Sequence, residues 1–449
     1  MKLDAVIKQL QGRWASLPDR RKPNNNQQYE MADAAMAALS VFFMQSPSFL
    51  AHQQALAQRT GQSNAVSLFR LNLIPSDGQI RNLLDGLRSE VFEADFEALH
   101  ARLRQQHPEQ WQGFADHAGT VLIALDGLTF FSSSKLQCPT CLKRETQSEG
   151  SGSPQTHYFH SAVTPVIVKP GSGHVLPLMP EFVEPQDGSE KQDCERNAAK
   201  RWLQRQRQQQ RFAPRSVTYL GDDLYACQPI CQLVIDSDQY FVCVAKPQSH
   251  VALYTVVAEL QHLGRLHQLT HKHWNGRHYE HWTFRFASEI PLRGDVNTLL
   301  VNWLEVTVSD ARTGKRLYFN TWITNHELSK DSVFALAQAG RARWKIENEN
   351  NNVLKNHGYH LEHNFGHGKQ HLSNVLFTLN LLAFLIHTLQ ELTAKPYQML
   401  RAALKARRTF FNDLRALTCY HVFDSWQHLW RFMLQSLDIV FDPALFFSD

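Results

Sequence analysis

The sequence contains no uninterrupted apolar run of the roughly 18 residues needed to span a membrane. The nearest candidate, residues 375–389, is interrupted by Thr378, Asn380 and His387. The N-terminus, M-K-L-D-A-V-I-K-Q-L, lacks the long apolar segment of a secretory signal. Seven cysteines provide no disulfide framework at this length, and their odd number favours a reducing compartment. These absences predict a cytoplasmic protein without a membrane partner.

The chain also lacks internal repeats, long low-complexity segments and a strong charge imbalance. Lys and Arg number 46 and Asp and Glu number 42, which gives a net charge of +4. The basic residues nevertheless gather in two stripes. Residues 196–215 contain seven of them and no acid, and residues 395–415 contain six with Asp413 as the one acid. Such stripes suit a phosphate backbone, although a solvated helix face explains each of them equally well.

The pattern of apolar residues predicts an α/β protein of two or three domains. Residues 1–115 carry helix and loop signals, including a helix at Ala32–Phe43 and a capped helix start at Ser76. The buried run T-V-L-I-A-L then begins a succession of strands and helices. The expected strands are 120–126, 160–168, 174–182, 216–220 and 240–245, with a helix at 191–210. This order is typical of a mixed sheet covered by helices.

Alternating apolar residues and turn signals over 250–326 predict an antiparallel β-rich insertion. A helix over 332–356 and a long buried helix follow it. The expected organisation is a helical N-terminal region (1–115), the first part of the core (116–249) with an inserted segment at 132–160, the insertion (250–326), the remainder of the core (327–395) and a helical C-terminal region (396–449).

Acidic residues close two of the predicted core strands and mark the helix after the insertion. Asp126 ends the first strand, Asp222 and Asp223 follow V-T-Y-L-G, and Glu347 lies on the helix. Carboxylates that converge from strand ends and a helix can hold Mg²⁺, and a pair of such ions activates a nucleophile for attack on a phosphodiester. Each aspartate alone is more often a turn or cap residue, so the prediction rests on the joint pattern.

The helix around Glu347 reads R-W-K-I-E-N-E-N-N-N-V-L-K. At 100° per residue, one stripe contains Arg343, Glu347, Asn350 and Leu354. Glu349 is the competing acid, but it points away from Arg343. An Arg–Glu pair at this spacing is usually solvated, whereas three consecutive asparagines disfavour a helix. A segment that accepts this cost beside a buried face is a candidate for a functional site.

Cysteine and histidine form a possible metal centre after the first strand. Cys138 and Cys141 are a CxxC pair, and His157, His160 and Cys194 follow, so that five candidates are available for the four positions of a zinc site. Two reduced cysteines in a loop are the alternative. A site with four protein ligands would be closed and therefore structural.

A histidine-rich segment, H-G-Y-H-L-E-H-N-F-G-H-G, follows the Glu347 helix. It predicts a DNA-facing loop, with a second metal site or a packed loop as alternatives. The candidate histidines are His357, His360, His363 and His367. Lys246 closes a core strand near the same sheet edge and is a candidate for contact with a phosphate backbone.

The order strand–Asp, strand–Asp, β insertion, helix–Glu resembles the DDE transposases of bacterial insertion sequences. Four segments carry the same resemblance: D-G-L-T-F-F-S-S, Q-D-G-S-E-K-Q-D-C-E-R-N-A-A-K-R, G-D-D-L-Y and N-H-G-Y-H-L-E-H-N-F-G-H-G. Members of that family have an RNase H-like core interrupted by a β domain before the Glu helix. The resemblance therefore implies an RNase H-like mixed-sheet core with a β-rich insertion and helical regions at both ends.

The related cut-and-paste group has the signature Tyr, two residues, Arg, three residues, Glu, six residues, Lys. Arg343 and Glu347 match it in register, whereas Gly340 stands at the Tyr position and Lys355 comes one residue late. The implied catalytic residues, which would hold two Mg²⁺ or Mn²⁺ ions, are Asp126, Asp222 and Glu347. Asp223 is the alternative to Asp222, which is favoured because Tyr225 then fits the family pattern of Asp, two residues, aromatic.

The resemblance also suggests residues for the other roles. Candidates for binding DNA phosphates are Arg343, Lys355, Lys246 and Asn351. The best-matching zinc ligands are Cys138, Cys141, His160 and Cys194, with His157 as the substitute.

The expected activity is cleavage of double-stranded DNA at the ends of an element and its transfer into target DNA, in the bacterial cytoplasm, by a homodimer or larger assembly. One alternative is a metal-dependent nuclease with the same core. Another is a non-catalytic, zinc-stabilised DNA-binding protein, against which the three intact acids argue.

Overall fold

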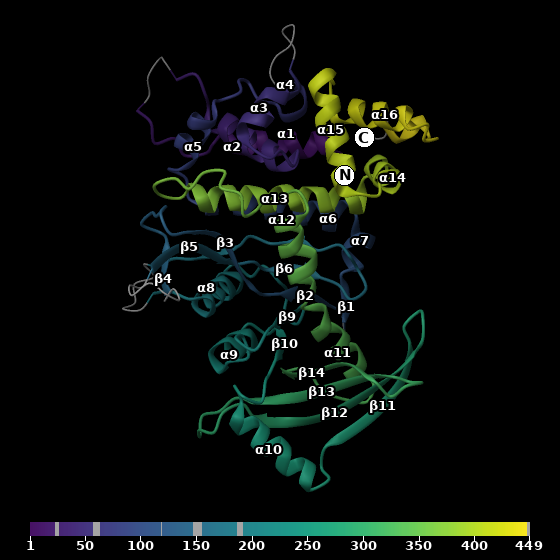
Figure 1. Ribbon diagram of the computed structural model, residues 1–449. Coiled ribbons are helices and arrows are strands. Elements are labelled where there is room, and N and C mark those ends of the chain that lie inside the picture. Colours follow the sequence, from purple (N-terminus) through teal and green to yellow (C-terminus); the bar gives the residue numbers. More distant parts are fainter. Residues whose placement is uncertain (23–26, 57–62, 118, 147–154, 186–191, 447–449) are drawn as a thin grey trace.

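The computed structural model describes residues 1–22, 27–56, 63–117, 119–146, 155–185 and 192–446. It is a mixed α/β structure with parallel and antiparallel strands in one large sheet and helices at both ends (Figure 1), as predicted at that level. The helices are α1 (Leu3–Trp14), α2 (Met31–Phe43), α3 (Phe49–Leu56), α4 (Asn64–Phe69), α5 (Asp77–Leu84), η1 (Ser89–Phe92), α6 (Glu93–Gln106), α7 (Pro108–Gln112), α8 (Glu195–Gln208), α9 (Gln228–Asp236), α10 (Val251–His262), α11 (Val333–Ala342), η2 (Ile346–Asn351), α12 (Asn352–Asn356), α13 (Leu372–Thr393), α14 (Lys395–Ala403), α15 (Arg407–Tyr420), α16 (Trp426–Ser436) and η3 (Pro443–Phe446). The strands are β1 (Ala115–His117), β2 (Thr120–Ala124), β3 (Gly127–Ser133), β4 (Leu142–Thr146), β5 (Gln155–Val163), β6 (Val166–Val168), β7 (Leu176–Pro177), β8 (Glu181–Val183), β9 (Val217–Gly221), β10 (Tyr240–Val244), β11 (His267–Trp274), β12 (Tyr279–Pro291), β13 (Leu300–Asp310) and β14 (Arg316–Thr324).

The large sheet has the order β11-β12-β13-β14-β10-β9-β2-β6-β7, with β1 on β2. At its centre β2, β9 and β10 run parallel, while β6 pairs antiparallel with β2 and β7 with β6. Every residue of β2 and β9 is buried. Continuous apolar runs of this kind belong to strands that are covered on both faces.

The insertion begins with a helix, α10, where the sequence predicted only strands. Leu253 and Val257, four residues apart, form its buried stripe. The strands β11 to β14 then form the predicted antiparallel meander. Because β14 pairs with β10, the meander extends the core sheet rather than forming a separate one.

The predicted strand at 160–168 is two strands in different sheets. β5 belongs to a four-stranded sheet with β3, β4 and β8, whereas β6 belongs to the large sheet. Pro165 lies between them, and proline cannot donate a hydrogen bond to a strand ladder. The predicted strand at 174–182 is likewise divided between β7 and β8.

Within the described residues, α13 is the one helix that is long and apolar enough to cross a membrane, and 94% of its most apolar window is buried inside the protein. Figure 1 shows α13 between the core sheet and a layer of helices drawn from both ends of the chain. Asp4 ties these ends together, because its carboxylate accepts the N–H groups of Trp426 and Gln427 at 3.0 and 3.3 Å, at the start of α16. α13 is therefore a core helix.

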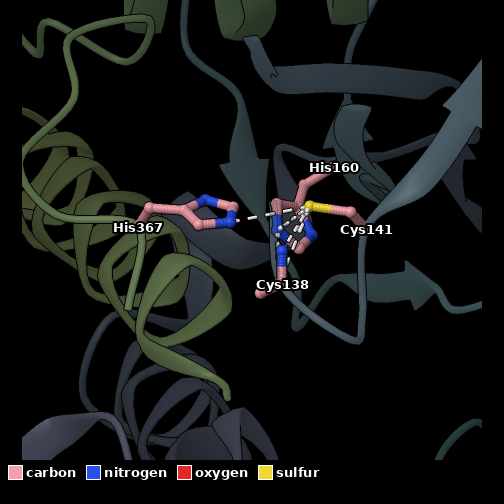
Figure 2. Close-up of side chains that lie close together, drawn as sticks. All are labelled: Cys138, Cys141, His160 and His367. Carbon is pink, nitrogen blue, oxygen red and sulfur yellow. Dashed lines mark hydrogen bonds between the residues drawn. The ribbon is translucent and has the colours of Figure 1, made fainter. Parts of the chain in front are cut away.

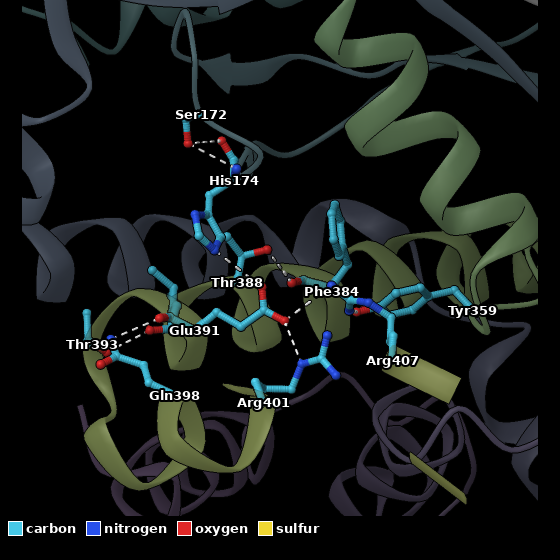
Figure 3. A network of polar contacts seen from close by, with 11 residues as sticks. Ser172, His174, Tyr359, Phe384, Thr388, Glu391, Thr393, Gln398, Arg401 and Arg407 are labelled. Atoms are coloured by element: carbon cyan, nitrogen blue, oxygen red, sulfur yellow. Dashed lines mark hydrogen bonds and ion pairs between the residues drawn. The ribbon is translucent and has the colours of Figure 1, made fainter. Parts of the chain in front are cut away.

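Glu391, on α13, joins three parts of the fold (Figure 3). Its carboxylate lies 3.5 Å from Nε2 of His174, 3.4 Å from Nε of Arg401 and 3.3 Å from Nη2 of Arg407. These partners come from the loop before β7, from α14 and from α15. Burial alone would raise the pKa of Glu391, but the hydrogen bond with His174 and the charges of Arg407 and Arg401 outweigh it and lower the pKa to about 2.

A carboxylate whose pKa is lowered on folding stabilises the protein above its unfolded pKa and loses that contribution as the pH falls through its folded value. We expect Glu391→Gln to lower the free energy of unfolding by about 3 kcal/mol at pH 7. The difference from the wild type should narrow between about pH 4.5 and 2, as urea unfolding across that range would measure. Glu259→Gln, at an exposed position on α10, is the control. An equal decrease in the free energy of unfolding of both variants would contradict the stabilising role of Glu391.

Candidate active site and metal centre

Asp126 and Asp222 stand at the same level of two neighbouring parallel strands. β2 pairs with β9 in the register Val121↔Val217 to Ala124↔Leu220, and the ladder continues with a hydrogen bond of 2.9 Å from Leu125 N to Leu220 O. Continued by two residues, the same register sets Asp126 opposite Asp222. Adjacent strands lie about 4.8 Å apart, so the two carboxylates project from the same edge of the sheet.

Glu347 reaches the same place from the segment after α11. It lies on η2, a π-helical turn, and Arg343 donates a hydrogen bond of 2.6 Å from Nη2 to its Oε1. The Glu347 side chain is 52% exposed and that of Arg343 is 19% exposed. The charge of Glu347 raises the pKa of Asp126 and that of Arg343 lowers it. Glu349 is not among the groups that change this pKa. The charges of Asp222 and Glu347 thus both reach Asp126, although among the described residues only the Cys/His group below has its ligand atoms within 4.8 Å of one another.

A fourth acid, Glu195, belongs to the same cluster and was not predicted. It begins α8, and its Oε1 accepts a hydrogen bond of 2.7 Å from the hydroxyl of Tyr225. The backbone of Gly127 also bonds to it, and a Cβ atom at Gly127 would collide with its carboxylate. A side chain at position 127 would therefore displace the Glu195 carboxylate from this place. The signal in the sequence was Glu195 itself, an acid in the first turn of an otherwise basic helix.

The cluster carries more negative charge than its surroundings neutralise. Burial raises the pKa of Asp126 to about 7, and the charges of Glu195, Glu347 and Asp222 add to the rise against the opposing charge of Arg343. Burial and Asp222 also raise the pKa of Glu195, while the hydrogen bond with Tyr225 opposes them. Arg343 acts on two of these acids, through its ion pair with Glu347 and its charge near Asp126.

Asp223 has a different environment from Asp222. Its Oδ1 accepts the N–H of Lys246 at 2.7 Å and lies 3.3 Å from Nε2 of His250, and Ser249 donates a short hydrogen bond to Oδ2. Asp223 thereby fixes the turn before α10. Asp222 instead caps its own turn through the N–H of Leu224 and acts on Asp126, which supports Asp222 as the site residue.

The proposed phosphate-binding residues are placed unequally. Lys246 has an exposed side chain, and Lys355 forms an ion pair of 2.9 Å with Glu362. Asn351 is buried and donates from Nδ2 to Oδ2 of Asp126 at 3.4 Å. Asn351 therefore contacts a carboxylate, and its predicted role as a phosphate ligand does not fit its surroundings.

Much of the positive charge in the two basic stripes is engaged inside the protein. In the first stripe, Arg201, Arg205 and Arg211 pair with acids on β8, η1–α6 and the segment before α8. In the second, Arg401 and Arg407 pair with Glu391. These arginines stabilise contacts between elements, a role that neither of the two sequence interpretations, phosphate binding or a solvated helix face, predicted.

Two thiols and two imidazoles gather between β5 and the loop before α13 (Figure 2). The residues are Cys138, Cys141, His160 and His367, and their ligand atoms lie within 4.8 Å of one another. The two Sγ atoms are 3.7 Å apart, His160 Nε2 is 3.5 Å from each of them, and His367 Nε2 is 3.6 Å from Cys141 Sγ. Tetrahedral zinc, with Zn–S of about 2.3 Å and Zn–N of about 2.0–2.1 Å, sets S···S near 3.8 Å and S···N near 3.5 Å. The group can hold a metal ion such as zinc.

The fourth member of this group is His367, not the predicted Cys194. Cys194 is exposed at the start of α8, where the next residue, Glu195, is directed to the carboxylate cluster. The substitute His157 lies three residues before His160 on β5, so it faces the opposite side of that strand. His367 was predicted as a DNA-facing residue; its ring instead stacks on Phe131 at 4.3 Å. His367 therefore joins the possible metal centre of Cys138 and Cys141, whereas the sequence predicted a DNA-facing loop or a separate metal site for its segment.

The two departures from the Tyr-Arg-Glu-Lys signature have structural explanations. A Cβ atom at Gly340 would lie 2.6 Å from Cε2 of Trp322, so α11 packs too closely on β14 for a tyrosine there. A π-helical turn contains one residue more than an α-helical turn. η2 lies between Glu347 and Lys355 and can accommodate the one additional residue in that interval.

No model of a known protein family matches the chain, and no curated protein matches it.

We expect the purified protein to contain about one zinc ion per chain. Cys138→Ser and His367→Ala should each remove it and lower the temperature of unfolding, because the metal would hold the His367 loop to the four-stranded sheet. Cys194→Ser and His157→Ala are matched controls and should retain it. Elemental analysis of the four variants is the measurement. Zinc loss in Cys194→Ser with retention in His367→Ala would restore the ligand set predicted from the sequence.

Proposed function

We propose that this protein is a DNA transposase of the DDE type, which cuts double-stranded DNA at the ends of its element and joins those ends to target DNA. The observation that carries the proposal is the convergence of Asp126, Asp222 and Glu347. These three acids come from two strand ends and a helix that follows a β-rich insertion, in the order that the resemblance implies. We further propose that the core, with its parallel strands β2, β9 and β10, is RNase H-like.

The residues at the cluster suit two Mg²⁺ or Mn²⁺ ions. Carboxylate oxygens are the ligands that these ions prefer. Burial first, and then the charges of Glu195, Glu347 and Asp222, raise the pKa of Asp126, and a bound cation would offset both. When bound, such ions activate the attacking oxygen and stabilise the leaving oxygen of a phosphodiester. The metal ligands would be Asp126, Asp222 and Glu347, with Glu195 beside them.

The remaining groups of the site orient the carboxylates and the DNA. Tyr225 and Gly127 hold Glu195, and Arg343 balances Glu347. A guanidinium beside the site can also bind a phosphate through two parallel hydrogen bonds. Lys246, exposed at the same sheet edge, is our second candidate for a phosphate contact.

The proposed reaction requires two DNA ends to be held together, so we infer a homodimer or larger assembly on DNA. The location that suits this reaction is the bacterial cytoplasm. The zinc that we propose at the Cys138 group would be structural, since four protein ligands leave no open position.

Removal of any one metal carboxylate should abolish cleavage. We expect Asp126→Ala, Asp222→Ala and Glu347→Ala to lose at least about 10³-fold in cleavage rate while they retain binding to element-end DNA, measured by gel shift. Asp223→Ala is the comparison. Because Asp223 fixes the turn before α10, this variant should have a lower temperature of unfolding but should still cleave DNA. If Asp222→Ala cleaves at the wild-type rate and Asp223→Ala does not, Asp223 is the metal ligand. If both cleave at the wild-type rate, the proposed site is wrong.

Transposition and simple cleavage are separated by one reaction. Purified protein, element-end DNA, Mg²⁺ and a target plasmid should give products in which the ends are joined to the plasmid, detected by gel electrophoresis and sequencing of the junctions. Cut ends without joined products would assign a metal-dependent nuclease. Binding without cutting would leave a DNA-binding protein stabilised by zinc.

A further inference from the structure

The asparagine run on η2 forms a short chain of side-chain hydrogen bonds that ends on Asp126. Asn350 donates from Nδ2 to Oδ1 of Asn351 at 2.9 Å, and Asn351 donates from Nδ2 to Oδ2 of Asp126 at 3.4 Å. Asn350 is fully buried and Asn351 is 9% exposed. Both side chains are therefore enclosed by protein rather than offered to a phosphate.

The chemistry of the groups fixes the direction of this chain. A carboxylate that holds a metal ion is ionised and only accepts hydrogen bonds, so in the proposed metal site Asn351 must present its NH₂ to Asp126. The carbonyl oxygen of Asn351 then faces Asn350, which must donate a hydrogen bond to it from its own NH₂. Each amide thus has one orientation, and Asn350 determines that of Asn351.

Burial of Asn350 is costly for stability and so calls for an explanation. Its Oδ1 is enclosed and has no hydrogen-bond partner among the residues that the structure describes. A buried acceptor without a partner is destabilising, and an apolar side chain of similar shape would avoid this. Asparagine is also a poor helix former. A sequence selected only for packing would not hold this residue here, whereas a site that needs an oriented donor would.

The π-helical turn sets Asn351 on the carboxylate side. One extra residue in the turn changes which side chains share the face of Glu347, and it brings Asn350 and Asn351 inward while Asn348 remains exposed. Glu347 and the amide that contacts Asp126 thus come from the same irregular turn.

We propose that Asn351 is a positioning residue that orients the carboxylate of Asp126, and that Asn350 in turn orients Asn351. The inference rests on the proposed function, since it assigns Asp126 to metal binding. A donor on Oδ2 fixes the rotation of the carboxyl group and directs Oδ1 toward the position between Asp126 and Asp222. Partners of this kind behind metal ligands raise metal affinity or activity by about 10–100-fold.

The test compares Asn351→Ala with Asn348→Ala, a matched control on the same turn. We expect the affinity for Mn²⁺, measured by calorimetry on the full-length protein without DNA, to fall about 10–100-fold in Asn351→Ala and to stay unchanged in Asn348→Ala. The Mg²⁺ concentration for half-maximal cleavage should rise by the same factor, and excess Mg²⁺ should restore cleavage.

Asn350→Leu separates positioning from a general loss of structure. Leu removes the enclosed oxygen of Asn350 but also the donor to Oδ1 of Asn351. These effects oppose each other, so the temperature of unfolding should stay close to that of the wild type, while the Mn²⁺ affinity falls as in Asn351→Ala. Wild-type Mn²⁺ affinity in both variants, with Asp126→Ala inactive, would overturn this inference alone. A lower temperature of unfolding in Asn351→Ala together with cleavage that excess Mg²⁺ does not restore would also overturn it. Full cleavage by Asp126→Ala would instead overturn the proposed function.

Discussion

The register between β2 and β9 is the constraint on which the carboxylate site depends. Parallel pairing with Val121 opposite Val217 sets Asp126 level with Asp222, although the two residues are far apart in the sequence. A shift of one residue would turn one of the two side chains to the other face of the sheet. The complete burial of both strands opposes such a shift, because it would bring polar residues into the core. The hydrophobic core therefore specifies the geometry of the most polar part of the protein.

Most of the ion pairs described above join neighbouring elements of the fold, and the carboxylate cluster differs from them. Many arginines of the basic stripes pair with acids of neighbouring elements, and Glu391 gathers two of them with His174. The carboxylate cluster is the exception, since the charges of Glu195, Glu347 and Asp222 act on Asp126 against Arg343 alone. Local excess of one sign is unfavourable in a folded protein and tends to mark functional sites. The contrast between balanced charge elsewhere and imbalance here distinguishes the cluster from a solvated surface.

Local sequence patterns predicted the elements that bear Asp126, Asp222 and Glu347, because strand ends and helix starts have short-range signals. They could not predict partners that depend on tertiary packing. Glu195 required knowledge of which end of α8 faces the sheet edge, and His367 meets Cys141 from 226 positions along the chain. Regular helical geometry also failed at the asparagine run, because a spacing argument assumes the same number of residues in every turn. Pro165 was the one local signal for the broken strand, and the apolar pattern around it concealed the break.

The two centres of the molecule share a feature of chain order. The carboxylate cluster has Asp126, Glu195 and Asp222 before the insertion, and the Cys/His group has Cys138, Cys141 and His160 there as well. Each centre takes its last member, Glu347 or His367, from beyond β14. During synthesis from the N-terminus, neither centre can therefore be complete until the insertion has been made. A chain released early would possess most of the members of both centres but would complete neither of them.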